Sequence, residues 1–260
     1  MSTQSYHRYV ALGDSQTEGI GDGDDVNGYR GFADRLAARL AGLNPELLYA
    51  NLAVRGKLAG EVHAEQLAPA LELRPDLATV VVGLNDILRP RFDLDATAGH
   101  IEAMFASLTR AGATVGTIAF PNVAKIAPLA RPLLPRVLTL NARIREAAAR
   151  HGVRVVETFE FEVTTDARTW SADRLHASPA GHQRIADSMA HALELPGADD
   201  SWTHPLPALP LPPRLTAIRT ELQWLSGFLG PWLGRRLRGI SSGTGRTAKR
   251  PELTRFLLNG

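Results

Sequence analysis

Hydrophobic and polar residues follow two alternating patterns over the first 195 positions. Short runs of apolar and β-branched residues predict strands, and the longer segments between them repeat apolar residues every three or four positions, which predicts helices. The predicted strands cover residues 8–12, 47–52, 77–82, 114–120 and 153–156. The third is apolar except for Thr79, which is typical of a strand buried on both faces. Strands and helices in this order predict a five-stranded parallel sheet with helices on both faces, an α/β/α sandwich of three layers.

The chain changes character after residue 195. Prolines recur first, an amphipathic stretch follows, and Gly, Ser and Thr then accumulate. The prolines predict a linker or an extended chain over residues 196–213, and the amphipathic stretch predicts a helix over 214–238. The Gly, Ser and Thr residues predict a flexible stretch over 239–248, within a basic tail. We therefore expect one domain over residues 1–195 and a C-terminal helical appendage over residues 196–260.

Charge is distributed unevenly between these two parts. Residues 1–195 carry 20 Lys and Arg against 23 Asp and Glu, whereas residues 196–260 carry 9 against 4. Because the domain is slightly acidic and has no nucleic-acid-binding motif, we expect no nucleic-acid partner. Residues 214–238 place Leu, Phe and Trp beside Arg, as in helices that bind membrane surfaces. Packing of this helix against protein is the interpretation that we favour, since apolar helical stripes most often face a protein core.

Composition limits the class of protein further. Hydrophobic residues make up 44% of the 260 residues and charged residues 22%, as in ordinary globular proteins. The chain has no cysteine, which excludes disulfides, thiolate metal sites and cysteine nucleophiles. No apolar signal segment precedes the first strand and no run of 18 apolar residues occurs, so a cytoplasmic location is expected.

A serine follows directly on the first predicted strand, in the sequence Gly13-Asp14-Ser15-Gln16-Thr17-Glu18-Gly19. Ligands of open parallel sheets bind at the carboxyl ends of the strands. The flanking glycines allow the sharp turn that presents a nucleophile. A helix N-cap explains this segment equally well when it is considered alone.

Further candidates follow the second and third strands. Gly56 ends the sequence Asn51-Leu52-Ala53-Val54-Arg55-Gly56, and Asn85 lies in Gly83-Leu84-Asn85-Asp86. A backbone amide and a side-chain amide at one sheet edge can donate hydrogen bonds to a developing oxyanion. A plain turn at the glycine and an Asx turn at the asparagine are the alternatives.

The last candidates are Asp173 and His176, just before the Ser178-Pro179 start of the final predicted helix. An aspartate three positions before a histidine can accept a bond from one imidazole nitrogen, which leaves the other free to take a proton from a serine. Each residue alone has an ordinary structural explanation. Their common place at one edge of the sheet favours a shared catalytic site.

In these four segments the chain resembles the SGNH, or GDSL, hydrolase family over residues 8–195. Its first block is similar to residues 10–19 here, its second to 51–56, its third to 83–86 and its last to 173–176. The residue after the serine departs from the family, whose usual leucine is Gln16 here.

The resemblance implies a flavodoxin-like fold and a serine esterase or acyl hydrolase. It implies Ser15 as nucleophile, His176 oriented by Asp173 as its base, and oxyanion donors at Ser15, Gly56 and Asn85. A small-molecule or lipid ester is the expected substrate, and its acyl chain and leaving group are left open. Acyl transfer at the same site, or a non-catalytic lipid- or carbohydrate-binding module, are the alternatives.

No cofactor or metal is expected. Asp22, Asp24 and Asp25 lie close together, but the spacing of a calcium-binding loop is missing. The proline-punctuated loop over residues 121–135 is expected to form part of the cleft wall, with Leu129, Leu133 and Leu134 as weak candidates for an acyl pocket.

Overall fold

A six-stranded sheet forms the middle layer of the structure, a computed structural model that describes residues 5–208, 219, 223–229 and 242–257. Its strand order is β7-β6-β5-β1-β4-β8. Neighbouring strands from β7 to β4 are parallel, and only β8 is antiparallel to its neighbour. The bounds are β1 Arg8–Gly13, β4 Leu48–Asn51, β5 Leu77–Val81, β6 Thr114–Ala119, β7 Arg154–Glu157 and β8 Arg250–Arg255.

The order of the parallel strands places a switch point at the middle of the sheet. In chain order these strands lie 2-1-3-4-5, which is the flavodoxin-like arrangement. After β1 the chain crosses to β4 on one side of the sheet, and after β5 it crosses to β6 on the other side. A crevice is therefore expected between the carboxyl ends of β1 and β5. The loops after Gly13 and Val81 therefore meet where a ligand site is expected.

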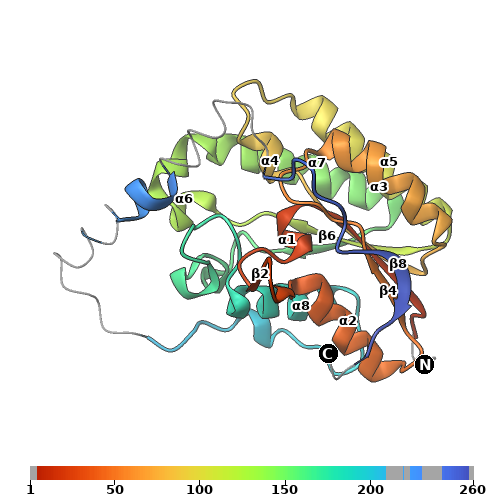
Figure 1. Ribbon diagram of the computed structural model, residues 1–260. Helices are drawn as coiled ribbons and strands as arrows, with labels where there is room; N and C mark the ends of the chain where they lie inside the picture. The colour runs from red at the N-terminus through yellow and green to blue at the C-terminus, as the bar shows by residue number, and fades with distance from the viewer. Residues whose placement is uncertain (1–4, 209–218, 220–222, 230–241, 258–260) are drawn as a thin grey trace.

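Helices cover both faces of the sheet (Figure 1). Helices α3, α5 and α7 pack together on one face, and α2 and α8 pack together on the other. Their bounds are α2 Phe32–Leu43, α3 Ala59–Glu72, α5 Leu94–Arg110, α7 Leu134–His151 and α8 Pro179–Ala192. Within the described ranges, no helix combines the length and the apolar character needed to cross a lipid bilayer.

Short elements connect these layers. They are the helices α1 Ser15–Glu18, α4 Leu84–Ile87 and α6 Val123–Ile126, the two-residue strands β2 Gly23–Asp24 and β3 Gly28–Tyr29, the 3-10 turns η1 Pro128–Leu133, η2 Glu162–Thr165, η3 Ala167–Thr169 and η4 Ser201–Thr203, and the π-helical turn η5 Leu225–Leu229.

The α/β sandwich predicted from the sequence is confirmed. All five predicted strands exist and are parallel, with ends that differ by one residue at most. The helix start predicted at Ser178 is also confirmed, since Ser178 Oγ accepts a hydrogen bond from Gly181 N at 3.2 Å and Pro179 is the first helical residue. The buried residues of β1 and β5 lie in the hydrophobic core. Tyr9 and Tyr49 stack there, with 5.1 Å between their ring centroids.

The C-terminal tail is built differently from the appendage predicted at residues 196–260. Residues 250–255 form β8, which pairs with β4 and completes the sheet as its edge strand (Figure 1). The sequence did not predict this strand because an edge strand needs few apolar residues, and Pro251 is tolerated there. Most of the helix predicted at 214–238 lies outside the described residues. The domain boundary near residue 195 stays a prediction, but the described end of the tail belongs to the same sheet.

Candidate active site

Ser15 lies on a tight turn at the carboxyl end of β1. The strand ends at Gly13, Asp14 caps the following helix, and Ser15 is its first residue. Gly13 has a φ of 153°, and a Cβ atom there would lie 2.4 Å from the Val81 carbonyl oxygen. The side-chain amide of Gln66 accepts from Gly13 N and donates to Gly13 O, both at 2.9 Å. The turn is therefore fixed from both sides, and only glycine fits at its start.

His176 is held by Asp173 in the loop before α8. His176 Nδ1 lies 2.6 Å from Asp173 Oδ2, while the other carboxylate oxygen accepts from Ser171 Oγ at 2.6 Å and from Leu175 N at 2.9 Å. Burial by itself would raise the pKa of Asp173, but the hydrogen bond and the charge of His176, with the Ser171 and Leu175 donors, hold that pKa well below its usual range. An ionised Asp173 that accepts from Nδ1 leaves Nε2 of His176 free to accept a proton.

A side-chain amide joins the two segments. Gln16 Nε2 donates to Leu175 O at 3.0 Å, and Gln16 Oε1 accepts from Ala177 N at 3.3 Å. The structure thus brings the turn of Ser15 and the loop of His176 together at one edge of the sheet. Within the described part of the chain, Ser15 Oγ makes no hydrogen bond, so no direct bond joins the two side chains in this state.

Gly56 lies in a loop that is tied to the same turn. Arg55 donates its backbone N–H to Glu18 Oε2 at 2.6 Å and its Nε–H to Glu18 Oε1 at 2.9 Å. Both side chains are largely buried, at 11% and 8% exposed, so solvent screens this pair weakly. Gly56 itself has a φ of 78°, a conformation that favours glycine. The Arg55–Glu18 pair therefore fixes the loop of Gly56 relative to the helix that begins with Ser15.

Asn85 lies beside the residue that precedes Ser15. Its Nδ2 donates to Asp14 Oδ2 at 3.0 Å and to Lys57 O at 3.1 Å. Burial raises the pKa of Asp14 to about 7, although the Gln16 amide, His176 and Asn85 act against this shift. The Asn85 amide is therefore fixed at the site, and both of its hydrogens are engaged in this state.

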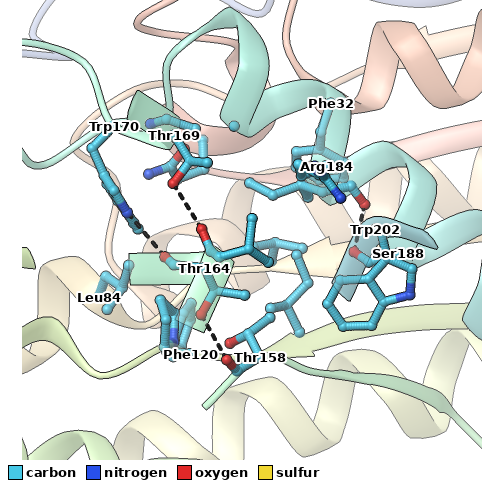
Figure 2. A pocket seen from close by; sticks show the side chains of 18 residues that line it. Phe32, Leu84, Phe120, Thr158, Thr164, Thr169, Trp170, Arg184, Ser188 and Trp202 are labelled. Atoms are coloured by element: carbon cyan, nitrogen blue, oxygen red, sulfur yellow. Dashed lines mark hydrogen bonds between the residues drawn. The ribbon is translucent and has the colours of Figure 1, made fainter. Parts of the chain in front are cut away.

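An apolar pocket opens beside these residues, between the sheet and α8 (Figure 2). Its cavity volume is about 70 Å³. Gln16, Leu84 and Ala177 form its wall next to the candidate catalytic residues, and Trp202 and Ser188 lie on the opposite side from Trp170. The rest of the wall is mostly apolar and includes Phe32, Val81, Ile118, Phe120, Pro121, Val163 and Ile185.

The predicted cleft wall at residues 121–135 contributes less than expected. Pro121 lines the apolar pocket, whereas Leu129, Leu133 and Leu134 do not, and Leu129 is 61% exposed. The three leucines do not line this pocket, and their assignment to an acyl pocket stays a prediction. Of the aromatic lining residues, Trp170 directly follows the turn η3 and Trp202 lies in the turn η4, and neither segment has hydrophobic periodicity, so no sequence pattern singled them out.

Trp224 is a further residue that the sequence did not assign to the site. Its Nε1 donates to Asp173 O at 3.0 Å, and the guanidinium of Arg174 lies 4.6 Å from its ring centroid. Only 6% of Trp224 is exposed. For this residue of the predicted helix at 214–238, packing against the domain is confirmed.

The three clustered aspartates of the sequence face different partners. Asp22, Asp24 and Asp25 bond to Arg35, Asn27 and Arg246 respectively, at 2.6, 2.9 and 2.7 Å. Among the residues with described positions, no group of three or more His, Asp and Glu side chains is placed to hold a metal ion.

Comparison with protein families gives one match that covers most of the chain. The sequence model of the GDSL-like Lipase/Acylhydrolase family matches residues 11–184. These residues include all four blocks in which the sequence resembles this family, except Val10 at the start of the first block. No curated protein matches the chain.

Solved structures share the fold at low sequence identity. An acetylxylan esterase from Geobacillus stearothermophilus is 18% identical with a TM-score of 0.62, and the match covers 77% of this chain and 100% of that one. The psychrotrophic esterase EstA from a Pseudoalteromonas species is 16% identical with a TM-score of 0.58, over 72% and 97% of the chains. A lipase/acylhydrolase from Enterococcus faecalis is 19% identical with a TM-score of 0.58, over 72% and 95%.

Proposed function

This chain belongs to the GDSL-like lipase/acylhydrolase family, and from that premise we propose that it cleaves a carboxylic ester through an acyl-Ser15 intermediate. One observation carries the proposal. Asp173 holds His176 through a 2.6 Å hydrogen bond, in a loop that Gln16 ties to the turn of Ser15. A serine, an imidazole and a carboxylate placed in this order form the arrangement that activates a serine for attack on a carbonyl.

In the proposed first half-reaction, Ser15 Oγ bonds to the ester carbonyl carbon while His176 Nε2 takes the hydroxyl proton. The carbonyl oxygen becomes an oxyanion, which the backbone N–H groups of Ser15 and Gly56 and the side chain of Asn85 stabilise. The ester C–O bond then breaks, and His176 gives its proton to the leaving alkoxide oxygen. An alcohol departs and the acyl group stays on Ser15.

In the second half-reaction a water molecule attacks the acyl carbon and His176 takes one of its protons. The bond to Ser15 Oγ breaks, Oγ regains the proton from His176, and a carboxylic acid leaves. Asp173 stays ionised throughout and stabilises the imidazolium that forms twice in the cycle. Donation by Asn85 to the oxyanion requires its Nδ2 to share or exchange one of its present bonds, to Asp14 or to Lys57.

The apolar pocket supports an acyl group with a hydrocarbon chain. Its wall includes Gln16, Leu84 and Ala177, the sequence neighbours of Ser15, Asn85 and His176, and most of its other lining residues are apolar, as in small-molecule sites. Burial of each methylene of a chain in such a pocket contributes roughly 0.8 kcal/mol. We therefore place the acyl chain in this pocket and the leaving alcohol toward solvent.

Two measurements test the activity and the nucleophile. A fluorophosphonate probe should label the purified protein, and p-nitrophenyl esters should be hydrolysed. Both reactions should disappear in Ser15→Ala and fall by several orders of magnitude in His176→Ala. Wild-type activity in Ser15→Ala would exclude the proposed nucleophile, and an unlabelled, inactive wild type would favour a binding module. An alcohol acceptor added to the assay separates hydrolysis from acyl transfer by the appearance of a new ester.

A chain-length series tests the pocket. Ile185 lines it from α8, and Ile185→Trp should fill part of its volume. Wild type is expected to prefer butyrate or octanoate esters to acetate, and the variant to lose rate on octanoate while keeping its rate on acetate. An unchanged preference in a folded variant would show that the acyl chain binds elsewhere. The cytoplasmic location stays a prediction.

A further inference from the structure

Gln16 is placed to control how closely His176 approaches Ser15. We propose that Gln16 is a positioning residue, an inference that rests on the proposed esterase function. Its covalent neighbour is Ser15, and the two groups that it binds belong to Leu175 and Ala177, the covalent neighbours of His176. The bridge therefore joins the two segments at the positions directly beside the reacting side chains.

The chemistry of the bridge requires a primary amide. One end of the Gln16 side chain donates to the Leu175 carbonyl at 3.0 Å and accepts from the Ala177 amide at 3.3 Å. A leucine can do neither, and an ionised glutamate cannot donate. Gln16 is 8% exposed, so removal of the amide leaves two backbone groups unsatisfied in a mostly buried place. The residue at which this chain departs from its family therefore has a defined structural task.

Gln16 and Asp173 make different connections. The Asp173 carboxylate bonds the imidazole, whose tautomer and orientation it fixes, and the backbone N–H groups of Leu175 and His176, so these bonds lie within the histidine loop. Gln16 bonds only the backbone on either side of the histidine, so it fixes where the ring is held relative to Ser15. Because a displacement of about 1 Å at a reacting centre can lower the rate roughly a hundredfold, a loose loop should cost rate without changing the charge of the base.

Other contacts keep the loop folded when the bridge is absent. Ser171 N donates to His176 O at 2.8 Å, and Ser178 N donates to Thr169 O at 2.9 Å, so a short hairpin holds the histidine segment. The backbone of Gly21 also passes close to it, since a Cβ on Gly21 would lie 2.1 Å from Ala177 O. Loss of the Gln16 amide should therefore shift the loop and leave the fold intact.

Gln16 also lines the apolar pocket, and the test has to separate the two roles. Gln16→Met keeps the length of the side chain and removes both hydrogen bonds, and Gln16→Leu restores the usual residue of the family. If Gln16 positions His176, both variants should lower kcat roughly ten- to a hundredfold, by the same factor for acetate and octanoate esters and with KM little changed. The rate constant for fluorophosphonate labelling of Ser15 should fall by a similar factor.

Gln183→Met is the matched control, because it makes the same substitution at a glutamine on α8 whose described bonds go to Arg35 and Asp187 and not to the histidine loop. This variant should leave kcat, KM and the labelling rate at their wild-type values. A chain-length-dependent effect of Gln16→Met on KM, with unchanged kcat and labelling, would show that Gln16 is only a wall residue and would overturn the proposal.

Hydrogen exchange supplies a measurement that needs no turnover. The Ala177 amide, which donates to Gln16 in the wild type, should exchange faster in Gln16→Met, while the amides of the central strand β5 keep their protection. Equal protection of Ala177 in both proteins would overturn the bridge. If the wild type shows no Ser15-dependent labelling, the proposed function is overturned, and the positioning role with it. If the wild type is labelled and Gln16→Met is labelled equally fast, only the positioning role is overturned.

Discussion

Lys249 and Asp34, which are far apart in the sequence, form an ion pair of 2.6 Å beside the turn that carries Ser15. Lys249 Nζ also donates to Glu18 O at 2.6 Å and to Tyr29 O at 2.9 Å, so all three of its protons have acceptors. Glu18 is the last residue of the helix that begins with Ser15. Lys249 therefore holds the tail against the segment that follows Ser15, directly before the tail continues into β8.

Lys249→Met should lower the stability of the domain by about 1–3 kcal/mol, because it leaves a carboxylate and two carbonyl groups without this donor. For a domain of this size the midpoint of thermal unfolding should fall by about 2–12 °C. Arg143→Met is the control, since Arg143 pairs with Asp95 on the surface and both are well exposed. Differential scanning fluorimetry of both variants checks this, and equal midpoints for the two would contradict a structural role for the tail.

The sequence predicted the parallel sheet because burial leaves a clear pattern. Strand β5 is buried along its whole length, and its run of apolar residues from Leu77 marks it plainly. Strand β8 has the opposite character. Most of its residues are exposed and its hydrogen bonds are made by the backbone, so its polar sequence resembles a flexible tail.

The candidate site could be proposed from the sequence to the extent that it depends on residue type and order. Ser15, Asn85 and His176 became candidates because chemistry restricts which residues can act at the ends of strands. The contacts of Gln16 and Trp224 could not be found in this way. Each joins segments that are far apart in the chain, and glutamine and tryptophan have many ordinary roles in proteins. Their contacts with the histidine loop are therefore seen only in the three-dimensional structure.

Asp173→Asn should lower kcat by roughly three to four orders of magnitude, because a neutral amide neither stabilises the imidazolium nor selects the tautomer with a free Nε2. Ester hydrolysis at saturating substrate measures this. Asp166→Asn is the control, since Asp166 bonds Arg168 in the neighbouring turn and makes no described bond to His176. Equal activities of the two variants would show that Asp173 does not orient the base.

Asn85→Ala should lower kcat roughly a hundred- to a thousandfold and change KM little, as expected for loss of one donor to an oxyanion. A variant that only destabilises the fold should lower the unfolding midpoint without this loss of kcat. Asn44→Ala removes an amide that bonds Tyr6 O at the opposite edge of the sheet, so it should lower stability and leave kcat near the wild-type value. Steady-state kinetics of the two variants, with unfolding midpoints, separate the oxyanion role from a packing role.

His182 should make the stability of the protein depend on pH. The ring is fully buried, accepts from Phe32 N at 3.2 Å, and has its other nitrogen 3.0 Å from Ile20 O, which requires the neutral form. Burial lowers the pKa of His182 from 6.5 to about 4. Since the unfolded chain takes up a proton below about pH 6.5 and the folded chain does not until about pH 4, the stability from this residue is complete above pH 6.5 and falls as the pH drops.

Between pH 7.5 and pH 5 this contribution should fall by about 2 kcal/mol, at about 1.4 kcal/mol for each pKa unit. Asp14 acts in the opposite direction, because burial raises its pKa to about 7 and the folded protein gains stability as the pH falls through that value. The decisive quantity is therefore the difference between wild type and His182→Gln, which both keep Asp14. Urea unfolding at the two pH values should show the variant less stable at pH 7.5, with that deficit reduced or reversed at pH 5. A difference that stays constant with pH would show that His182 titrates alike in the folded and unfolded chain.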